Sequence, residues 1–364
     1  MNIQKIKFIA AALSAMVLLS GGVSAQSGGG YEIKQSVIAS GGGNASGSGF
    51  SMDGTIGQAF AGTGSTGAGF SLESGFWASG QAAMTTRRSP FDFDGDNKTD
   101  VSVFRPSDGS WWYLRSIDSA FRVFRFGLAT DRIAPGDYTG DGKEDPGVFR
   151  PSTGEWYIQR SEDNSFFSFP FGTSEDIPAP ADFDGDGKTD AAVYRPSSGT
   201  WFILNSGGSG TSIVQFGSSE DRPVPADFDG DGKSDIAIFR PSDGSWWYLQ
   251  STNSQFKVYR FGIGTDKTVQ GDYTGDGKAD LAVFRPTTGE WYFQRSEDNS
   301  YYSFVWGQTG DIPAPGDYDG DGKFDAAVFR PSNSTWFANR TSSAVLIVAF
   351  GAGGDVPIPS AFVR

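Results

Sequence analysis

The chain has 364 residues and a formal net charge of −14, with 51 glycines, 31 phenylalanines and 10 tryptophans but no cysteine or histidine. The missing residue types exclude a Ser-His-Asp triad, imidazole-bound zinc, disulfides, thiolate catalysis and iron–sulfur clusters. The acidity argues against a nucleic-acid partner and suits cations, while an aromatic content of 15% indicates a chain with a large core.

Residues 1–25 are predicted to be a secretory signal peptide. Lys5 and Lys7 give a positive start, residues 8–19 are apolar, and small residues end the segment at Ala25. The apolar run is short for a membrane span, so an uncleaved anchor is the less favoured alternative. We therefore expect a secreted or cell-surface protein with no transmembrane segment after cleavage.

The next segment, residues 26–88, is rich in glycine and serine, and its alternating pattern predicts two or three strands. Two interpretations are open, because the segment forms a small β module of its own or joins the last strand of the chain as an extra sheet. A GxGxxG match at residues 62–67 is discounted, since glycine is abundant here and no βαβ unit follows.

A 45-residue period organises residues 89–364. Each copy contains a DxDGDGxxD-type nonapeptide, then three strand-like runs and then a proline-bearing connector. In the third copy the three runs are residues 190–196, 200–206 and 211–217. Four short strands per repeat of this length, without helical periodicity, predict an all-β fold, a β-propeller of four-stranded repeats. The nonapeptides begin at Asp92, Asp137, Asp182, Asp227, Asp272 and Asp317.

Two further features indicate a closed ring. Copies one to three resemble copies four to six, so that a three-copy unit recurs after 135 residues. Residues 355–363 repeat the strand that opens each copy, but no nonapeptide follows them. An extra strand at one end is what a ring closed by strand sharing requires. Six blades and seven blades both remain compatible with this pattern.

The nonapeptides have the chemistry of a calcium site. Positions 1, 3, 5 and 9 supply side-chain oxygens and position 7 a backbone carbonyl, which suits a cation with six to eight oxygen ligands. Glycines at positions 4 and 6 permit positive-φ turns, and Asn97, at position 6 of the first copy, tolerates the same region. Without a counter-ion the clustered carboxylates repel one another. We therefore expect about six structural Ca²⁺ ions, one per loop.

The expected ligands, each lysine through its carbonyl oxygen, are Asp92, Asp94, Asp96, Lys98 and Asp100; Asp137, Thr139, Asp141, Lys143 and Asp145; Asp182, Asp184, Asp186, Lys188 and Asp190; Asp227, Asp229, Asp231, Lys233 and Asp235; Asp272, Thr274, Asp276, Lys278 and Asp280; and Asp317, Asp319, Asp321, Lys323 and Asp325. Thr139 and Thr274 bring no charge to position 3, so their loops should bind more weakly. The lysine side chains are expected to be solvated and to soften the negative charge.

The loops, the VFRPS-like strands after them and a Phe-Gly pair near the end of most copies resemble FG-GAP-like or VCBS repeats over roughly residues 88–364. The pairs begin at Phe126, Phe171, Phe216, Phe261 and Phe350, with Trp306-Gly307 as a variant. The resemblance implies a β-propeller like the head of integrin α subunits, with calcium loops in hairpins on one face. It implies no ligand or activity, because this fold hosts unrelated functions.

Two further residue types recur in every copy. The tryptophans either form a sugar-stacking platform or pack between blades, and we favour packing because large aromatics dominate cores. We expect each arginine of the Arg-Pro pairs to bind an aspartate or carbonyl, or to stack on an aromatic ring, rather than to form an anion site. They are Trp111, Trp156, Trp201, Trp246, Trp291 and Trp336, with Trp112 and Trp247 as second rings, and Arg105, Arg150, Arg195, Arg240, Arg285 and Arg330.

Three functions compete. The first is a secreted, calcium-stabilised interaction or adhesion module with a protein or glycan partner outside the cell. The second is a carbohydrate-binding lectin. The third is a polysaccharide-active enzyme, which would need one asymmetric acidic pair that repeated copies do not single out. We favour the first, and we expect neither an enzyme nor a catalytic residue.

Overall fold

The computed structural model describes residues 43–47, 50–54, 65–67, 70–72 and 88–364, in two units that divide after Ala83. In the first unit, β1 (Gly43–Gly47) pairs with β2 (Phe50–Gly54), and β3 (Ser65–Gly67) pairs with β4 (Phe70–Leu72), each pair antiparallel. The glycine-rich segment thus has four short strands where the sequence predicted two or three. The predicted signal peptide lies outside the described residues.

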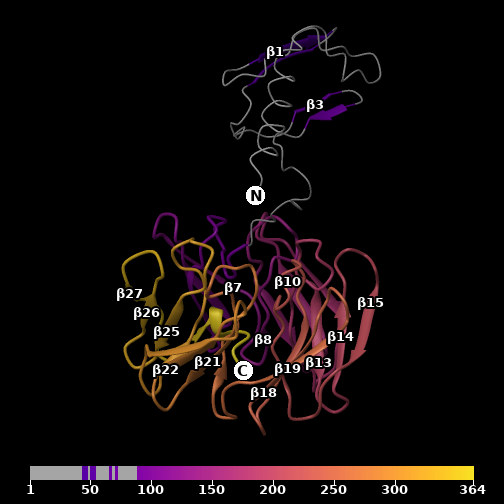
Figure 1. Cartoon of the computed structure of the whole chain (residues 1–364). Helices are drawn as coiled ribbons and strands as arrows, with labels where there is room; N and C mark the ends of the chain where they lie inside the picture. The colour runs from indigo at the N-terminus through magenta and orange to yellow at the C-terminus, as the bar shows by residue number, and fades with distance from the viewer. Residues whose placement is uncertain (1–42, 48–49, 55–64, 68–69, 73–87) are drawn as a thin grey trace, which may run out of the picture. The chain divides into compact units, whose positions relative to one another are not determined.

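Residues 88–364 form a six-bladed β-propeller, a ring of four-stranded antiparallel sheets (Figure 1). The blades, each from its innermost strand outward, are: β28 (Val356–Pro357), β5 (Val101–Arg105), β6 (Ser110–Leu114), β7 (Phe121–Arg125); β8 (Arg132–Ile133), β9 (Gly147–Arg150), β10 (Glu155–Gln159), β11 (Phe166–Pro170); β12 (Ile177–Pro178), β13 (Ala191–Arg195), β14 (Thr200–Leu204), β15 (Thr211–Gln215); β16 (Arg222–Pro223), β17 (Ile236–Arg240), β18 (Ser245–Leu249), β19 (Phe256–Arg260); β20 (Lys267–Thr268), β21 (Leu281–Arg285), β22 (Glu290–Gln294), β23 (Tyr301–Val305); β24 (Ile312–Pro313), β25 (Ala326–Arg330), β26 (Thr335–Asn339), β27 (Leu346–Ala349).

Burial decreases outward along each blade. In blade 3, four of the five residues of β13 are buried, β14 alternates between buried and half-buried residues, and β15 alternates between half-buried and exposed ones. A strand covered by neighbouring blades on both faces reads as a continuous apolar run, whereas an edge strand keeps the two-residue period. This gradient explains why the second strand of each copy is the most apolar part of the repeat.

The last strand of the chain closes the ring. Val356 pairs with Phe104 and Pro357 with Val103, so β28 completes blade 1 beside β5. This confirms the predicted strand sharing and gives six blades. The alternative of a seventh blade built with the glycine-rich segment is wrong for the described residues, because β28 is already paired. A 3₁₀ turn, η1 (Ile358–Ser360), follows β28. In the part of the chain that the structure describes, no helix is long and apolar enough to span a bilayer.

The recurring tryptophans form the centre of the blades. All six are at most 1% exposed, so packing is confirmed and the sugar platform is wrong for this set. Each indole N–H donates to a main-chain carbonyl near the end of its blade, as Trp201 does to Phe216 over 3.1 Å. The second rings, Trp112 and Trp247, are half-buried, and the guanidinium carbons of Arg105 and Arg240 lie 4.8 and 5.2 Å from their centroids.

Every arginine of the Arg-Pro pairs binds a buried aspartate just before the innermost strand of its own blade. In blade 3, Nε and Nη2 of Arg195 donate to the two carboxylate oxygens of Asp176 over 2.8 Å each, and the guanidinium stacks on Phe202. Asp176 also accepts the N–H of Thr173 over 2.8 Å, which fixes the turn that enters the strand. The pairs are Arg105–Asp355, Arg150–Asp131, Arg195–Asp176, Arg240–Asp221, Arg285–Asp266 and Arg330–Asp311.

We predict that Arg195→Ala lowers the free energy of unfolding by about 3 kcal/mol or more, because it leaves a buried carboxylate without its counter-charge. The side chain of Asp176 is 0% exposed, so water cannot replace the guanidinium. Urea unfolding would measure the loss. Arg122→Ala, at an exposed position of β7, is the matched control and should change stability by less than about 0.5 kcal/mol. Equal effects of the two substitutions would contradict the assignment.

Candidate metal centres

All six nonapeptides lie on one face of the ring, because each leads into the second strand of its blade, after the innermost strand in blades 2 to 6 and after residues 88–91 in blade 1. The strands of a blade are antiparallel, so the turn between its third and fourth strands returns to the same face. The Arg–Asp pairs lie at the other ends of the strands. The predicted placement of the loops in hairpins on one face is therefore confirmed.

The aspartate at position 1 organises each loop. In blade 3, Asp182 accepts the N–H of Gly185 over 2.6 Å with one oxygen and that of Gly187 over 2.9 Å with the other. Both glycines have positive φ, 78° and 83°, and Asn97 takes their place in the first loop with φ of 65°. The backbone conformation expected of positions 4 and 6 is thus present, and it wraps the chain round the carboxylate of position 1.

The aspartate at position 9 joins the loop to the neighbouring turn. Asp190 is fully buried and accepts the N–H of Phe183 over 2.8 Å and that of Ser206 over 2.6 Å. The Ser206 hydroxyl in turn donates to Asp186, at position 5, over 3.0 Å. Sequence reasoning missed this serine or threonine, although it recurs with the 45-residue period. Its six members are Ser116, Ser161, Ser206, Ser251, Ser296 and Thr341.

Carboxylate oxygens converge in the four loops that have aspartate at position 3. Three oxygens of each set lie within 4.8 Å of one another, and burial raises the pKa of Asp100 and Asp325 to about 7 and that of Asp235 to about 6. Burial of an ionised carboxylate close to other carboxylates raises the free energy of the fold unless a cation neutralises the charge. The sets are Asp92, Asp94 and Asp96; Asp182, Asp184 and Asp190; Asp227, Asp229 and Asp235; and Asp317, Asp319 and Asp325.

Position 3 supplies a further sign of a missing ligand. Thr139 Oγ1, Asp229 Oδ1 and Asp319 Oδ1 are buried and have no hydrogen-bond partner. Buried polar atoms are nearly always paired, so an orphan oxygen at the same position of three loops calls for a partner that accepts lone pairs. A hard cation such as Ca²⁺ is such a partner and takes carboxylate and hydroxyl oxygens together. The residues present therefore fit the expected ion.

The loops are linked to one another round the ring. The N–H at position 8 of each loop donates to the position 1 carbonyl of the preceding loop over 2.6–2.7 Å, and Thr99 closes the circle by donating to Asp317. The stem of each position 7 lysine also packs on the position 4 glycine of the preceding loop, as Lys143 does on Gly95. These lysines are half-buried because their stems cover the bare glycine backbone, a contact that the sequence did not indicate.

The loop of the second copy has an additional cation. Arg88, just before the first blade, forms an ion pair with Asp137, the position 1 aspartate of that loop. The same loop carries Thr139 at position 3, and its carboxylates do not form a converging set among the described residues. A bound ion would therefore compete with a guanidinium here, which the sequence did not indicate.

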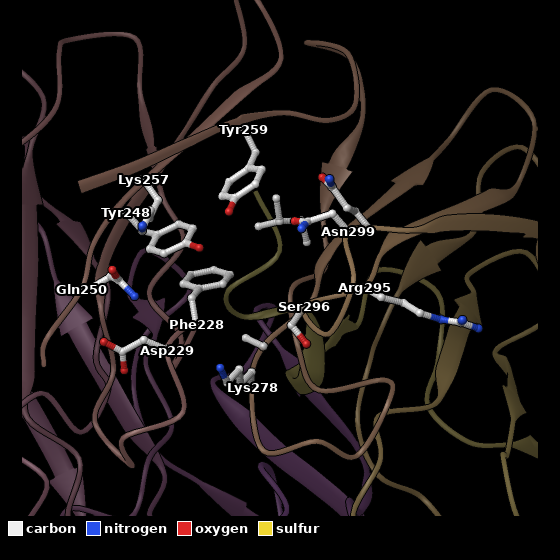
Figure 2. Close-up of a pocket in the computed structure, with 13 residues that line it drawn as sticks. Phe228, Asp229, Tyr248, Gln250, Lys257, Tyr259, Lys278, Arg295, Ser296 and Asn299 are labelled. Atoms are coloured by element: carbon white, nitrogen blue, oxygen red, sulfur yellow. The ribbon is translucent and has the colours of Figure 1, made fainter. Parts of the chain in front are cut away.

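A pocket opens between blades 4 and 5 on the face of the loops, with a volume of about 190 Å³. Figure 2 shows the rings of Phe228, Tyr248 and Tyr259 on one side and Ser296 and Asn299 on the other. Phe228 and Tyr248 are stacked with centroids 4.7 Å apart. Loop position 8 lines the pocket and is alanine here, Ala279, whereas the other five copies have a larger residue, namely Thr99, Glu144, Thr189, Ser234 and Phe324.

These observations define a six-bladed β-propeller with a repeated acidic loop on one face. The chain carries FG-GAP-like repeats, and that repeat family matches residues 182–238, 227–283 and 272–328. The matched residues include the loops of the third to sixth copies. No curated protein matches the chain.

Several solved structures resemble the ring. Streptogramin B lyase is 8% identical with a TM-score of 0.46, over 70% of this chain and 84% of that one. An Agrocybe aegerita lectin that recognises non-reducing terminal N-acetylglucosamine is 15% identical with a TM-score of 0.44, over 73% and 89%. Virginiamycin B lyase from Staphylococcus aureus is 5% identical with a TM-score of 0.45, over 70% and 85%. These similarities are too distant to assign a function.

Proposed function

We propose that the chain is an exported, calcium-binding β-propeller whose ions are structural and whose ring acts as an interaction module outside the cell. The observation that carries the calcium site is the buried, unpartnered oxygen at position 3 beside converging carboxylates. The residues at positions 1, 3, 5 and 9 and the carbonyl at position 7 would hold the ion. Bound calcium would supply positive charge and oxygen coordination, which offset the burial of the carboxylates.

The site of action follows from chemistry and from the N-terminal sequence. Lys5, Lys7 and the apolar residues 8–19 favour export. Extracellular calcium modules work with dissociation constants of about 10⁻⁴–10⁻³ M, which suits loops whose ligands are partly exposed. A chain without cysteine has no disulfide to stabilise it outside the cell, and metal loops would take that role. An interaction module also agrees with the expectation that the chain is not an enzyme, which stays a prediction.

We predict two classes of calcium site, about four tight and two weak. The Thr139 and Thr274 loops each have one carboxylate fewer at position 3, and affinity in such loops follows ligand charge. Arg88 weakens the first of the two further, because it neutralises Asp137. Isothermal titration of calcium into the stripped protein should give two phases near a ratio of 4:2. Thr139→Asp combined with Thr274→Asp should merge the phases, and Arg88→Gln alone should tighten only one weak site.

One tight class of six sites in the unmodified protein would contradict the charge argument, and no binding at all would contradict the proposed function. Ser198→Asp is the matched control, because it adds a carboxylate at the exposed turn after β13, away from the loops. It should leave both phases unchanged.

A carbohydrate-binding function is the second candidate, supported by the pocket between blades 4 and 5. Stacked tyrosines beside amide and hydroxyl groups are a combination that binds sugars, because a ring face covers the C–H face while polar groups reach the hydroxyls. A glycan array probed with and without calcium would test it. Tyr259→Ala should abolish a specific signal, whereas Phe124→Ala, the same position in blade 1, should not. A signal that both variants keep would rule this pocket out.

A further inference from the structure

The innermost strands bring positive charge to the axis of the propeller. Each has two residues, and the first of them is cationic in three blades, namely Arg132, Arg222 and Lys267, and a branched aliphatic residue in the other three. These first residues follow the aspartates of the Arg–Asp pairs, so they lie at the face opposite to the acidic loops. In a chain of net charge −14, this gathers cations at one place.

The end of the chain forms a floor across the axis. The Arg364 N–H donates to Thr268 Oγ1 over 3.3 Å in blade 5, while its guanidinium donates to the Pro178 carbonyl over 2.9 Å in blade 3. Figure 1 shows the C-terminus in the middle of the ring. A cavity of about 430 Å³ opens above this floor, lined by Ser360, Ala361 and Arg364 and by residues of the first three blades. Its volume is in the range of small-molecule sites.

Two cations, Arg132 and Arg364, line this cavity, and neither they nor the cations of the other innermost strands have an acidic side-chain partner among the described residues. Arg132 donates to the Asp176 carbonyl over 2.7 Å, and none of Arg132, Arg222, Lys267 and Arg364 has a described aspartate or glutamate carboxylate within 4.0 Å. Asp131, the one aspartate or glutamate among the described residues that line the cavity, already binds Arg150 through both oxygens.

The cations also affect one another. Arg364 Nε is buried without a hydrogen-bond partner, and burial together with the charge of Arg132 lowers the pKa of Arg364 to about 10. Burial and the charges of Arg222 and Arg364 lower the pKa of Lys267. Like charges this close raise the free energy of the empty cavity, and a bound anion would relieve the repulsion.

We propose that the axial cavity binds an organic carboxylate with a partly apolar body. The carboxylate would lie between Arg132 and Arg364, where guanidinium groups offer donors matched to its two oxygens. The apolar body would contact Ile133, Ile177 and Val356, which line the same cavity. The site lies on the face opposite to the loops, so it does not depend on whether they bind calcium.

The test is a titration of the full chain with 4-phenylbutyrate at low ionic strength, followed by NMR, with 4-phenylbutanamide as the neutral isostere. The acid should bind and the amide should bind at least tenfold more weakly, since the pair differs in the charge that the arginines would recognise. Arg132→Gln should weaken the affinity for the acid by about ten- to a hundredfold. Arg122→Gln, which removes an exposed cation on β7, should leave this affinity unchanged.

Ile177→Asp gives a second variant that keeps every cation and places a competing carboxylate in the wall. This variant should also weaken binding of the acid, and thermal melting should show that the ring is still folded. Equal binding of acid and amide, or unchanged binding in both Arg132→Gln and Ile177→Asp, would overturn the proposal. Inorganic sulfate binding as tightly as the acid would overturn the part assigned to the apolar wall.

Discussion

Removal of calcium with a chelator is expected to lower the melting temperature of this protein by at least about 10 °C. A ligand that binds only the folded state adds about 2.7 kcal/mol per site when its concentration is one hundred times its dissociation constant. The four tight loops would together add about 11 kcal/mol at that saturation, which is comparable with the 5–15 kcal/mol that holds a typical domain together. Stripping the ions also leaves buried carboxylates such as Asp190 and Asp325 without a counter-charge.

The contacts between loops predict that this loss spreads round the ring. Each position 8 N–H depends on the position 1 carbonyl of the loop before it, so a loop that loosens withdraws an acceptor from its neighbour. Circular dichroism melts in calcium, in excess EDTA and after calcium is restored would measure the effect. Mg²⁺ should restore less, because it demands a tighter octahedral site. Superimposable melts in calcium and EDTA would show that the ions are not structural.

A single damaged loop should cost less than a full strip. Asp186→Ala removes one position 5 ligand and should abolish about one ion, since blades contact mainly their neighbours. Ser197→Ala, at the exposed turn on the opposite face of the same blade, is the matched control. A loss as large as that produced by EDTA would mean that the six loops bind as one cooperative unit.

Much of the ring follows from local chemistry in the sequence. Glycine at positions 4 and 6 indicates a backbone with positive φ, and Asn97, which replaces one of these glycines, tolerates the same region. The backbone conformation of the loops was therefore predictable. The six tryptophans recur at one point of each copy. Because neighbouring blades bury both faces of a blade, side chains at that point were expected to lie in the core. The extra strand at residues 355–363 is also explained by the repeat pattern, because the first copy lacks an innermost strand of its own. The extra strand therefore pairs with β5.

Contacts between copies were not predictable in the same way. The packing of Lys143 on Gly95 joins different repeats, and a periodic sequence is silent on which face of one copy meets the next. Arg88 and Arg364 lie outside the repeat, so no periodic signal ties them to Asp137 or to the axis. The pocket beside Ala279 is lined by residues of two blades, so it becomes visible only when the neighbouring blade is in place.

Deletion of residues 355–364 is expected to open the ring at blade 1. The deletion removes β28, the partner carboxylate of Arg105 and the fully buried Ile358, whose loss alone would cost about 2–5 kcal/mol. Hydrogen exchange should then show β5, β6 and β7 losing protection before the strands of blade 4, because blade 1 is left with three strands and an uncovered inner edge. Deletion of residues 361–364 alone is the control, since it keeps β28 in place.

A synthetic peptide of residues 355–364 should restore the protection of blade 1 when it is added to the shortened protein. An extended peptide that supplies the missing ladder hydrogen bonds binds a sheet edge by strand addition, and Asp355 would again meet Arg105. A peptide with Asp355→Ala should bind more weakly, because it cannot form that bidentate pair. If the longer deletion melts at the same temperature as the shorter one, the contact of Thr99 with Asp317 on the loop face closes the ring without the shared strand.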